Sequence, residues 1–174
     1  MDRKRRGRAL RVFYSYCHKD SRHRKRLSEH LSLLRRENLI SDWYDGMIGA
    51  GCEIDDEIRA NLARADLILL LISHAFIDSG YCWEKEMREA VKRHRKGSAR
   101  VIPVIVSPVE EGWQTTLFGG LKALPADGKP VTKWSNRDSA WADVANGIRI
   151  AIMEMSEGLA MRAAGGRSVG KRKR

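Results

Sequence analysis

Carboxylates and aromatic rings lie close together in the segment from Ser79 to Ala90. Within it, Tyr81, Glu84 and Glu86 follow an apolar run, Leu67 to Ile72, that is typical of a fully buried strand. Open α/β sheets bind their ligands at the carboxyl ends of their parallel strands. A carboxylate flanked by aromatic rings at such a place is suited to polar chemistry on a substrate that carries a ring.

An alternation of strands and helices would have to position these side chains. Apolar runs predict strands at residues 10–16, 39–43, 66–73, 100–106 and 130–133. Amphipathic spacing and capping residues predict a helix that begins at Asp20 or Ser21 and ends at 36, and further helices at 53–64, 83–95 and 138–155. Pro103 interrupts the fourth strand, which favours a bulge or a less central place for that strand.

This alternation predicts an α/β fold in which about five strands form a mainly parallel sheet with helices on both faces. Because crossover connections are right-handed, the expected layout is flavodoxin-like. A length of 174 residues corresponds to about one domain, and an apolar content of 43% is sufficient for a core.

The positive charge of the chain lies at its two ends. The net charge is +11, yet residues 1–11 contain six Lys or Arg and one Asp, and residues 158–174 contain six Lys or Arg and no acid. The stretch between them is neutral. We therefore expect a basic N-terminal tail (1–9), one domain (10–155) and a basic, disordered C-terminal tail (156–174). Specific nucleic-acid binding is not expected, because it usually requires a basic folded face.

Several other classes of protein are not indicated. No apolar run approaches the roughly 18 residues that a membrane span needs, and the basic N-terminus lacks the apolar region of a signal peptide. Three sparse cysteines, Cys17, Cys52 and Cys82, favour free thiols in a reducing cytoplasm. The histidine spacing predicts no metal site, and the glycine motifs that cradle phosphates, GxGxxG and GxxxxGK[ST], do not occur.

Four segments carry a resemblance to a known family through their order and spacing. They are Val12 to Asp20; Ile40 to Gly51; Ala65 to Ser73 with Ser79 to Glu86; and Arg100 to Val106 with Leu124-Pro125 and Pro130-Val131. Together they cover about residues 10–153, and this stretch resembles a Toll/interleukin-1 receptor (TIR) domain of the bacterial type.

Members of that family are of two kinds. Some are adaptors that signal by stacking TIR domains. Others, including many bacterial members, cleave the bond between nicotinamide and ribose in NAD+ with one glutamate on the helix after the third strand. The resemblance implies that this glutamate contacts the ribose hydroxyls and offsets the charge of an oxocarbenium-like transition state.

Glu86 matches that glutamate best, because an aliphatic residue, Met87, follows it. The match departs from the family pattern on the other side: the residue four before Glu86 is Cys82, and the aromatic Tyr81 is one further back. Glu84 is the alternative. The two glutamates would point about 200° apart on a helix, so only one can face a cleft. Both could instead be solvated acids at a helix start.

The resemblance carries over to five further positions. Phe13 and Ser15 match residues that line the nicotinamide–ribose pocket, although Phe13 could equally be part of the core. Trp43 and Asp45 match the start of a mobile loop that runs here from Tyr44 to Cys52, and Asp45 could equally serve an Asx turn. Tyr81 is placed to stack on the nicotinamide or to cap the pocket.

We therefore expect an NAD+ nucleosidase, a hydrolase of N-glycosyl bonds, that acts in bacterial anti-phage defence. NAD+ would be its substrate, and no cofactor or metal is expected. Its product could be linear, cyclic or conjugated ADP-ribose. Two alternatives stay open: a non-catalytic TIR scaffold for protein–protein signalling, and a related nucleoside-processing hydrolase or transferase. Expected partners are NAD+, further copies of the domain and a separate sensor or effector protein, with no membrane and a cytoplasmic location.

Overall fold

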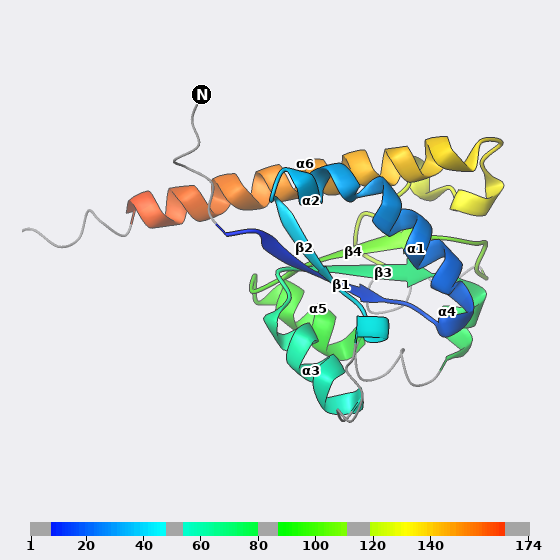
Figure 1. Cartoon of the computed structure of the whole chain (residues 1–174), viewed down its shortest axis with the longest axis horizontal. Coiled ribbons are helices and arrows are strands. Elements are labelled where there is room, and N and C mark those ends of the chain that lie inside the picture. The colour runs from blue at the N-terminus through cyan, green and yellow to red at the C-terminus, as the bar shows by residue number, and fades with distance from the viewer. Residues whose placement is uncertain (1–7, 48–53, 80–86, 111–118, 166–174) are drawn as a thin grey trace, which may run out of the picture.

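A parallel sheet with strand order β2-β1-β3-β4 forms the centre of the computed structural model, which describes residues 8–47, 54–79, 87–110 and 119–165 (Figure 1). The strands are β1 (Leu10–Ser15), β2 (Ile40–Trp43), β3 (Leu67–Ile72) and β4 (Arg100–Ile105). The α-helices are α1 (Ser21–His30), α2 (Ser32–Arg36), α3 (Ile54–Arg64), α4 (His74–Asp78), α5 (Met87–Arg95) and α6 (Arg137–Gly165). The 3-10 segments are η1 (His18–Asp20), η2 (Asp45–Met47), η5 (Ala126–Gly128) and η6 (Val131–Lys133). The α/β fold with a parallel sheet is therefore confirmed.

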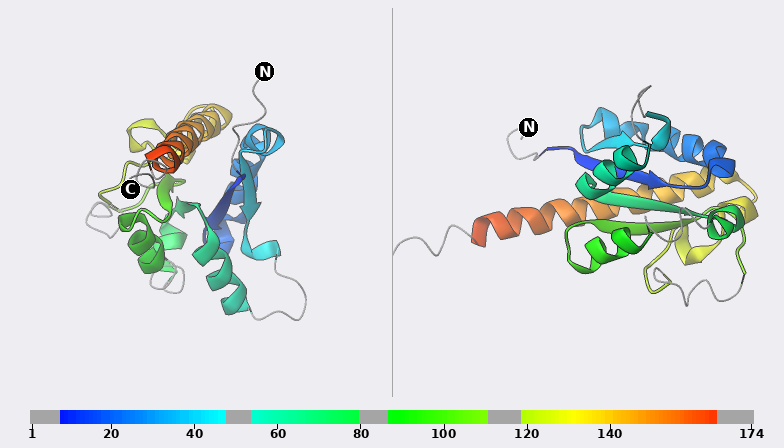
Figure 2. Two further views of the ribbon diagram at one scale, coloured as in Figure 1. Left: turned by 90° about the vertical axis from the view of Figure 1, so that its left-hand side faces the viewer. Right: turned by 90° about the horizontal axis from the view of Figure 1, so that it is seen from below.

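Strand β3 is buried on both faces, as its unbroken apolar sequence predicts. Leu67, Leu69 and Leu71 pack into one hydrophobic core, whereas the residues that alternate with them pack into a second core. Helices α1, α2 and α6 cover the first of these faces, and α3 and α5 cover the second (Figures 1 and 2). The period of two along the strand thus divides the molecule into two cores separated by the sheet.

The expected fifth strand at 130–133 is wrong, because Val131–Lys133 forms the 3-10 segment η6. The outer edge of β4 instead pairs with one residue, Leu124, whose backbone accepts from Ile105 N at 2.8 Å and donates to Pro103 O at 2.9 Å. Backbone N–H groups alternate between the two sides of a strand, so Pro103 lies on the same outer side as Ile105. It has no N–H to offer there, and a continuous ladder cannot form. The prediction of a less central strand around Pro103 is confirmed.

The helix expected from Asp20 or Ser21 to 36 is divided at Leu31 into α1 and α2. Leu31 has φ −88° and ψ 3°, outside the helical geometry of its neighbours. The predicted apolar face is nonetheless correct, because Leu27, Leu31 and Leu34 are all buried. The break therefore turns the helix without exposing its apolar side.

Helix α6 continues past its expected end at Met155 as far as Gly165. The segment from 156 to 165 contains three Ala together with one each of Glu, Leu, Met and Arg, all of which have high helix propensity. Met155 is the last described residue of the helix that packs against the core, and beyond it Glu157, Gly158 and Met161 are exposed. Figure 1 shows this end of α6 extending beyond the sheet. Among the described residues, no helix is long and apolar enough to cross a membrane.

Arg8, which falls in the expected N-terminal tail, is bound to the domain. Its guanidinium donates to both carboxylate oxygens of Asp66, at 2.6 and 2.7 Å, and the backbone N–H of Arg11 donates to the same carboxylate at 2.8 Å. Burial opposes the ionised form of Asp66, but these hydrogen bonds and charges together hold the pKa of its carboxyl below the usual range. The start of β1 is thus fixed to the start of β3.

Deletion of residues 158–174 should leave the fold intact, because the described side chains in this stretch are exposed and lie past the core. We expect the melting temperature to change by about 2 °C or less in a calorimetric scan. Ile148→Ala, on the fully buried part of α6, is the matched control. It should lower the melting temperature by about 5 °C or more, since it leaves a cavity. A large loss on truncation would show that the tail packs onto the domain.

Candidate functional site

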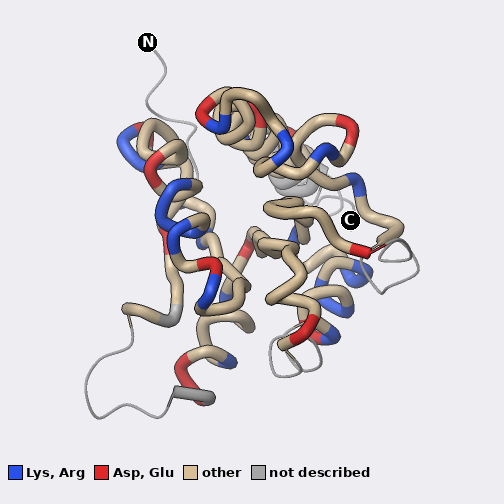
Figure 3. The backbone as a smooth tube through the Cα atoms, turned by 90° about the vertical axis from the view of Figure 1, so that its right-hand side faces the viewer, with Lys and Arg blue, Asp and Glu red and all other residues tan. Residues whose placement is uncertain are grey.

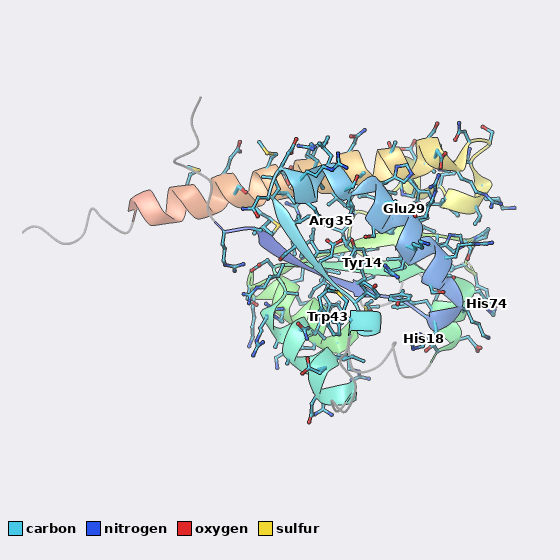
Figure 4. All side chains as sticks on the ribbon, viewed as in Figure 1. Tyr14, His18, Glu29, Arg35, Trp43 and His74 are labelled. Atoms are coloured by element: carbon cyan, nitrogen blue, oxygen red, sulfur yellow. The ribbon has the colours of Figure 1, made fainter. Side chains whose placement is uncertain are left out.

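An aromatic pair joins β1 to the carboxyl end of the neighbouring strand β2. Phe13 pairs with Trp43 in the strand register, and their rings stack with centroids 5.2 Å apart and planes inclined by 16°. Both side chains point to the face that α3 and α5 cover. In Figure 4, Trp43 lies beside η2, where β2 ends. The structure therefore brings together two of the residues that the sequence associates with substrate.

The two rings differ in how far a ligand could reach them. Phe13 is 2% exposed and belongs to the core, so it supports Trp43 from within. Trp43 is only partly buried, and Cys17, also partly buried, packs against the same core. Trp43 is therefore the more accessible ring of the pair, and Phe13 backs it from within the core.

Ser15 is buried at the end of β1, where it lies in register with Leu70 of β3. It is on the same side of the strand as Phe13, because side chains two residues apart share a face. Asp45 is the first residue of η2, and only Tyr44 separates it from the end of β2 at Trp43. Its backbone thus borders the same rim.

Glu86, Glu84 and Tyr81 lie outside the described residues. The described chain resumes directly after Glu86, at Met87, the first residue of α5. Met87 is 1% exposed and belongs to the core that also contains Phe13. The first turn of α5 is therefore on the same side of the sheet as the aromatic pair.

A buried carboxylate at this rim was not predicted from the sequence. Asp20 is 7% exposed and accepts a hydrogen bond of 2.5 Å from the hydroxyl of Ser73, at the end of β3. The Ser73 oxygen in turn accepts from the N–H of Phe76 and so caps α4. Asp20 precedes α1 as expected, but its side chain makes no capping bond there. Ser73, which follows the apolar run of β3, is a typical helix-capping residue and could have indicated the start of α4 from the sequence.

The opposite face of the sheet carries a polar network under β2. Asp42 Oδ2 accepts from Tyr14 at 3.0 Å, from Ser28 at 3.3 Å and from Arg35 at 2.5 Å. Burial and the Asp42 charge raise the pKa of Tyr14 well above its usual value, so its hydroxyl remains a donor. Asp42 directly precedes Trp43, and Figure 4 shows Tyr14 and Arg35 on the α1 and α2 side. The network therefore fixes the strand end that carries Trp43.

These features define the class of the molecule: a doubly covered parallel sheet with aromatic and polar side chains gathered at its carboxyl edge. The family model described as TIR domain matches residues 12–143, which is most of the chain. The chain therefore belongs to the TIR domain family, and the resemblance read from its sequence is confirmed.

Two relatives illustrate the extent of the likeness. The uncharacterized protein y4lF of Sinorhizobium fredii (strain NBRC 101917 / NGR234) is 44% identical over 140 residues, which cover 80% of this chain and 43% of that protein. The chain thus spans less than half the length of this relative. The TIR domains in the activated Roq1 resistosome, which directly recognizes the pathogen effector XopQ, share the fold: the TM-score is 0.50 at 19% identity, covering 79% of this chain and 84% of that one.

Asp42→Ala should destabilise the domain by about 2–3 kcal/mol, because the Tyr14 hydroxyl loses its carboxylate acceptor and the Arg35 guanidinium loses its charged partner, keeping only its bonds to Ser28. Urea unfolding at neutral pH measures this loss. Glu154→Ala is the matched control: its ion pair with Arg100 is 2.6 Å long but exposed, so the change should cost less than about 1 kcal/mol. Equal effects of the two substitutions would contradict a structural role for the network.

Proposed function

We propose that this protein is an NAD+ glycohydrolase that cleaves the bond between nicotinamide and ribose. The observation that carries the proposal is the position of α5: its first residue, directly after Glu86, packs into the core that holds Phe13 and Trp43. Family membership supports it as well, because the TIR resemblance implies this activity for enzymatic members. Glu86 is the proposed catalytic residue.

The chemistry requires little from the protein. The nicotinamide of NAD+ is already cationic, so it leaves as a neutral molecule when its bond to C1′ breaks. Water adds to C1′ and releases a proton, which gives ADP-ribose. A carboxylate that binds the ribose hydroxyls would orient the sugar and offset the positive charge that develops on it.

The proposed substrate-binding residues would contact two parts of NAD+, the nicotinamide ring and the ribose next to it. Trp43, supported by Phe13, would form the apolar wall for the nicotinamide, and Tyr81 would close the pocket from the segment before α5. Ser15 and Asp45 would border the ribose from the ends of β1 and β2. Asp20 is less suited to a catalytic role, because the Ser73 hydroxyl already donates to it.

Self-association is part of the proposed mechanism. The TIR domains of the activated Roq1 resistosome belong to an assembly, and TIR resemblance implies stacking of domains in this family. Here Met47 in η2 is 54% exposed, close to Trp43 in the sequence, and offers apolar surface to a neighbouring copy. We propose that such assembly, triggered by a sensor protein in anti-phage defence, completes the site. A scaffold without catalysis is the alternative.

Glu86→Ala should lower NAD+ cleavage roughly 100-fold or more, because the ribose loses the group that positions it. The melting temperature should hardly change, since an acid at a helix start contributes only about 0.3–1 kcal/mol. Product formation is followed by liquid chromatography and mass spectrometry. Glu84→Ala is the matched control and should retain the parent rate. If Glu84→Ala is inactive and Glu86→Ala is not, the assignment is wrong; if the parent protein never cleaves NAD+, the scaffold function is favoured.

Specific activity should rise with protein concentration if assembly completes the site. Met47→Asp should suppress that rise while leaving the melting temperature unchanged, because it places a charge on an exposed apolar contact. Activity and light scattering are measured on the same dilution series. Constant specific activity in a species that stays monomeric throughout would exclude this mechanism.

A further inference from the structure

Arg24, in the middle of α1, is held by aromatic rings instead of by a carboxylate. Its guanidinium carbon lies 3.7 Å from the centroid of the Tyr44 ring and 5.9 Å from that of Tyr16. Within the part of the chain that the structure describes, its Nε is buried and has no hydrogen-bond acceptor. The neighbouring Arg26 and Arg35, in contrast, pair with carboxylates.

The Tyr44 ring is itself fixed in place. A Cβ added at Gly46 would lie 2.5 Å from Cε2 of Tyr44, so only glycine permits this close approach of backbone and ring. The ring thus lies between the Gly46 backbone and the Arg24 guanidinium. A guanidinium held by its face can still donate from its terminal Nη groups, and it loses little further freedom when an anion binds.

This stacked arginine lies at the rim of the candidate site. Tyr44 directly follows Trp43, and Tyr16 directly follows Ser15, so the two rings continue the strands that carry proposed substrate-binding residues. Because side chains alternate along a strand, Trp43 and Tyr44 point to opposite faces at the same edge. A ligand that reaches Trp43 on one face would pass the end of the sheet near Arg24.

A partly buried cation without a carboxylate partner is unfavourable for the folded state. Among the described residues, Arg24 makes no ion pair that would offset this cost. Phosphate oxygens match the fork of a guanidinium and form strong charge-assisted hydrogen bonds with it. An anionic ligand would therefore supply the charged hydrogen-bond acceptor that the guanidinium of Arg24 lacks among the described residues.

We infer that Arg24 binds the pyrophosphate of the dinucleotide substrate. This inference rests on the proposed function for the identity of the substrate, but its chemistry is separate from bond cleavage. Glu86 would act on the ribose of the nicotinamide side, whereas Arg24 would hold the phosphates between the two nucleosides. Arg24 is thus a binding residue that the TIR resemblance did not indicate.

Binding of ADP-ribose, which contains the pyrophosphate and lacks the bond that is cleaved, tests the inference. Isothermal titration calorimetry on the full chain should show that Arg24→Gln weakens ADP-ribose roughly 10- to 100-fold. Arg24→Lys, which keeps the charge but loses the planar fork, should have an intermediate effect. Lys25→Gln removes the same charge from the next, exposed residue and should change affinity about twofold or less.

Adenosine, which has no phosphate, separates binding from folding. Its affinity, and the melting temperature, should be the same for the parent and Arg24→Gln. The inference is overturned if the parent does not bind ADP-ribose, if Arg24→Gln binds it as the parent does, or if adenosine is weakened equally. Failure of the proposed function looks different: NAD+ stays uncleaved while ADP-ribose binding still depends on Arg24.

Discussion

Burial of β3 on both faces is the constraint on which the rest of the molecule depends. A strand whose successive side chains enter two separate cores needs helices above and below it, and it needs a neighbour on each edge. The crossover helices α3 and α5 cover one face of the sheet, and α1, α2 and α6 cover the other (Figure 2). Strands β1 and β4 are the neighbours of β3 on its two edges. All strands then end at the same edge, and the candidate site follows from that alignment.

The alternation of side chains along the strands also separates two kinds of chemistry. Phe13 and Trp43 lie on the face of α3 and α5. Tyr14, which follows Phe13, and Asp42, which precedes Trp43, lie on the face of α1 and α2. Stacking on one face and a polar network on the other hold the same strand ends. Figure 3, in which the right-hand side of Figure 1 faces the reader, shows charges of both signs spread over the surrounding helices.

Much of this arrangement could be predicted from the sequence. The apolar runs of β1, β3 and β4 and the leucine face shared by α1 and α2 depend on local periodicity, which a sequence shows directly. The absence of a fifth strand could not be predicted from local periodicity. A fifth strand would have to pair with the outer edge of β4, and Pro103 lacks the N–H that such pairing needs. The pairs Asp20–Ser73 and Arg24–Tyr44 join residues distant in sequence, so no spacing rule could find them. The resemblance pointed to Trp43 and Phe13 as candidate site residues, but their stacking depends on the register of β1 and β2.

The same strand that organises the fold is a hazard before the fold exists. Leu67 to Ile72 is six residues long, wholly apolar and uncharged, which is the composition of segments that pair with copies of themselves into cross-β fibrils. A newly made chain is protected only when helices cover both faces of this segment, and α5 and α6 follow it in the sequence. Arg64 and Asp66, at its amino end, place charges of opposite sign where self-pairing would begin. Asp66 therefore serves the unfolded chain as well as the folded one.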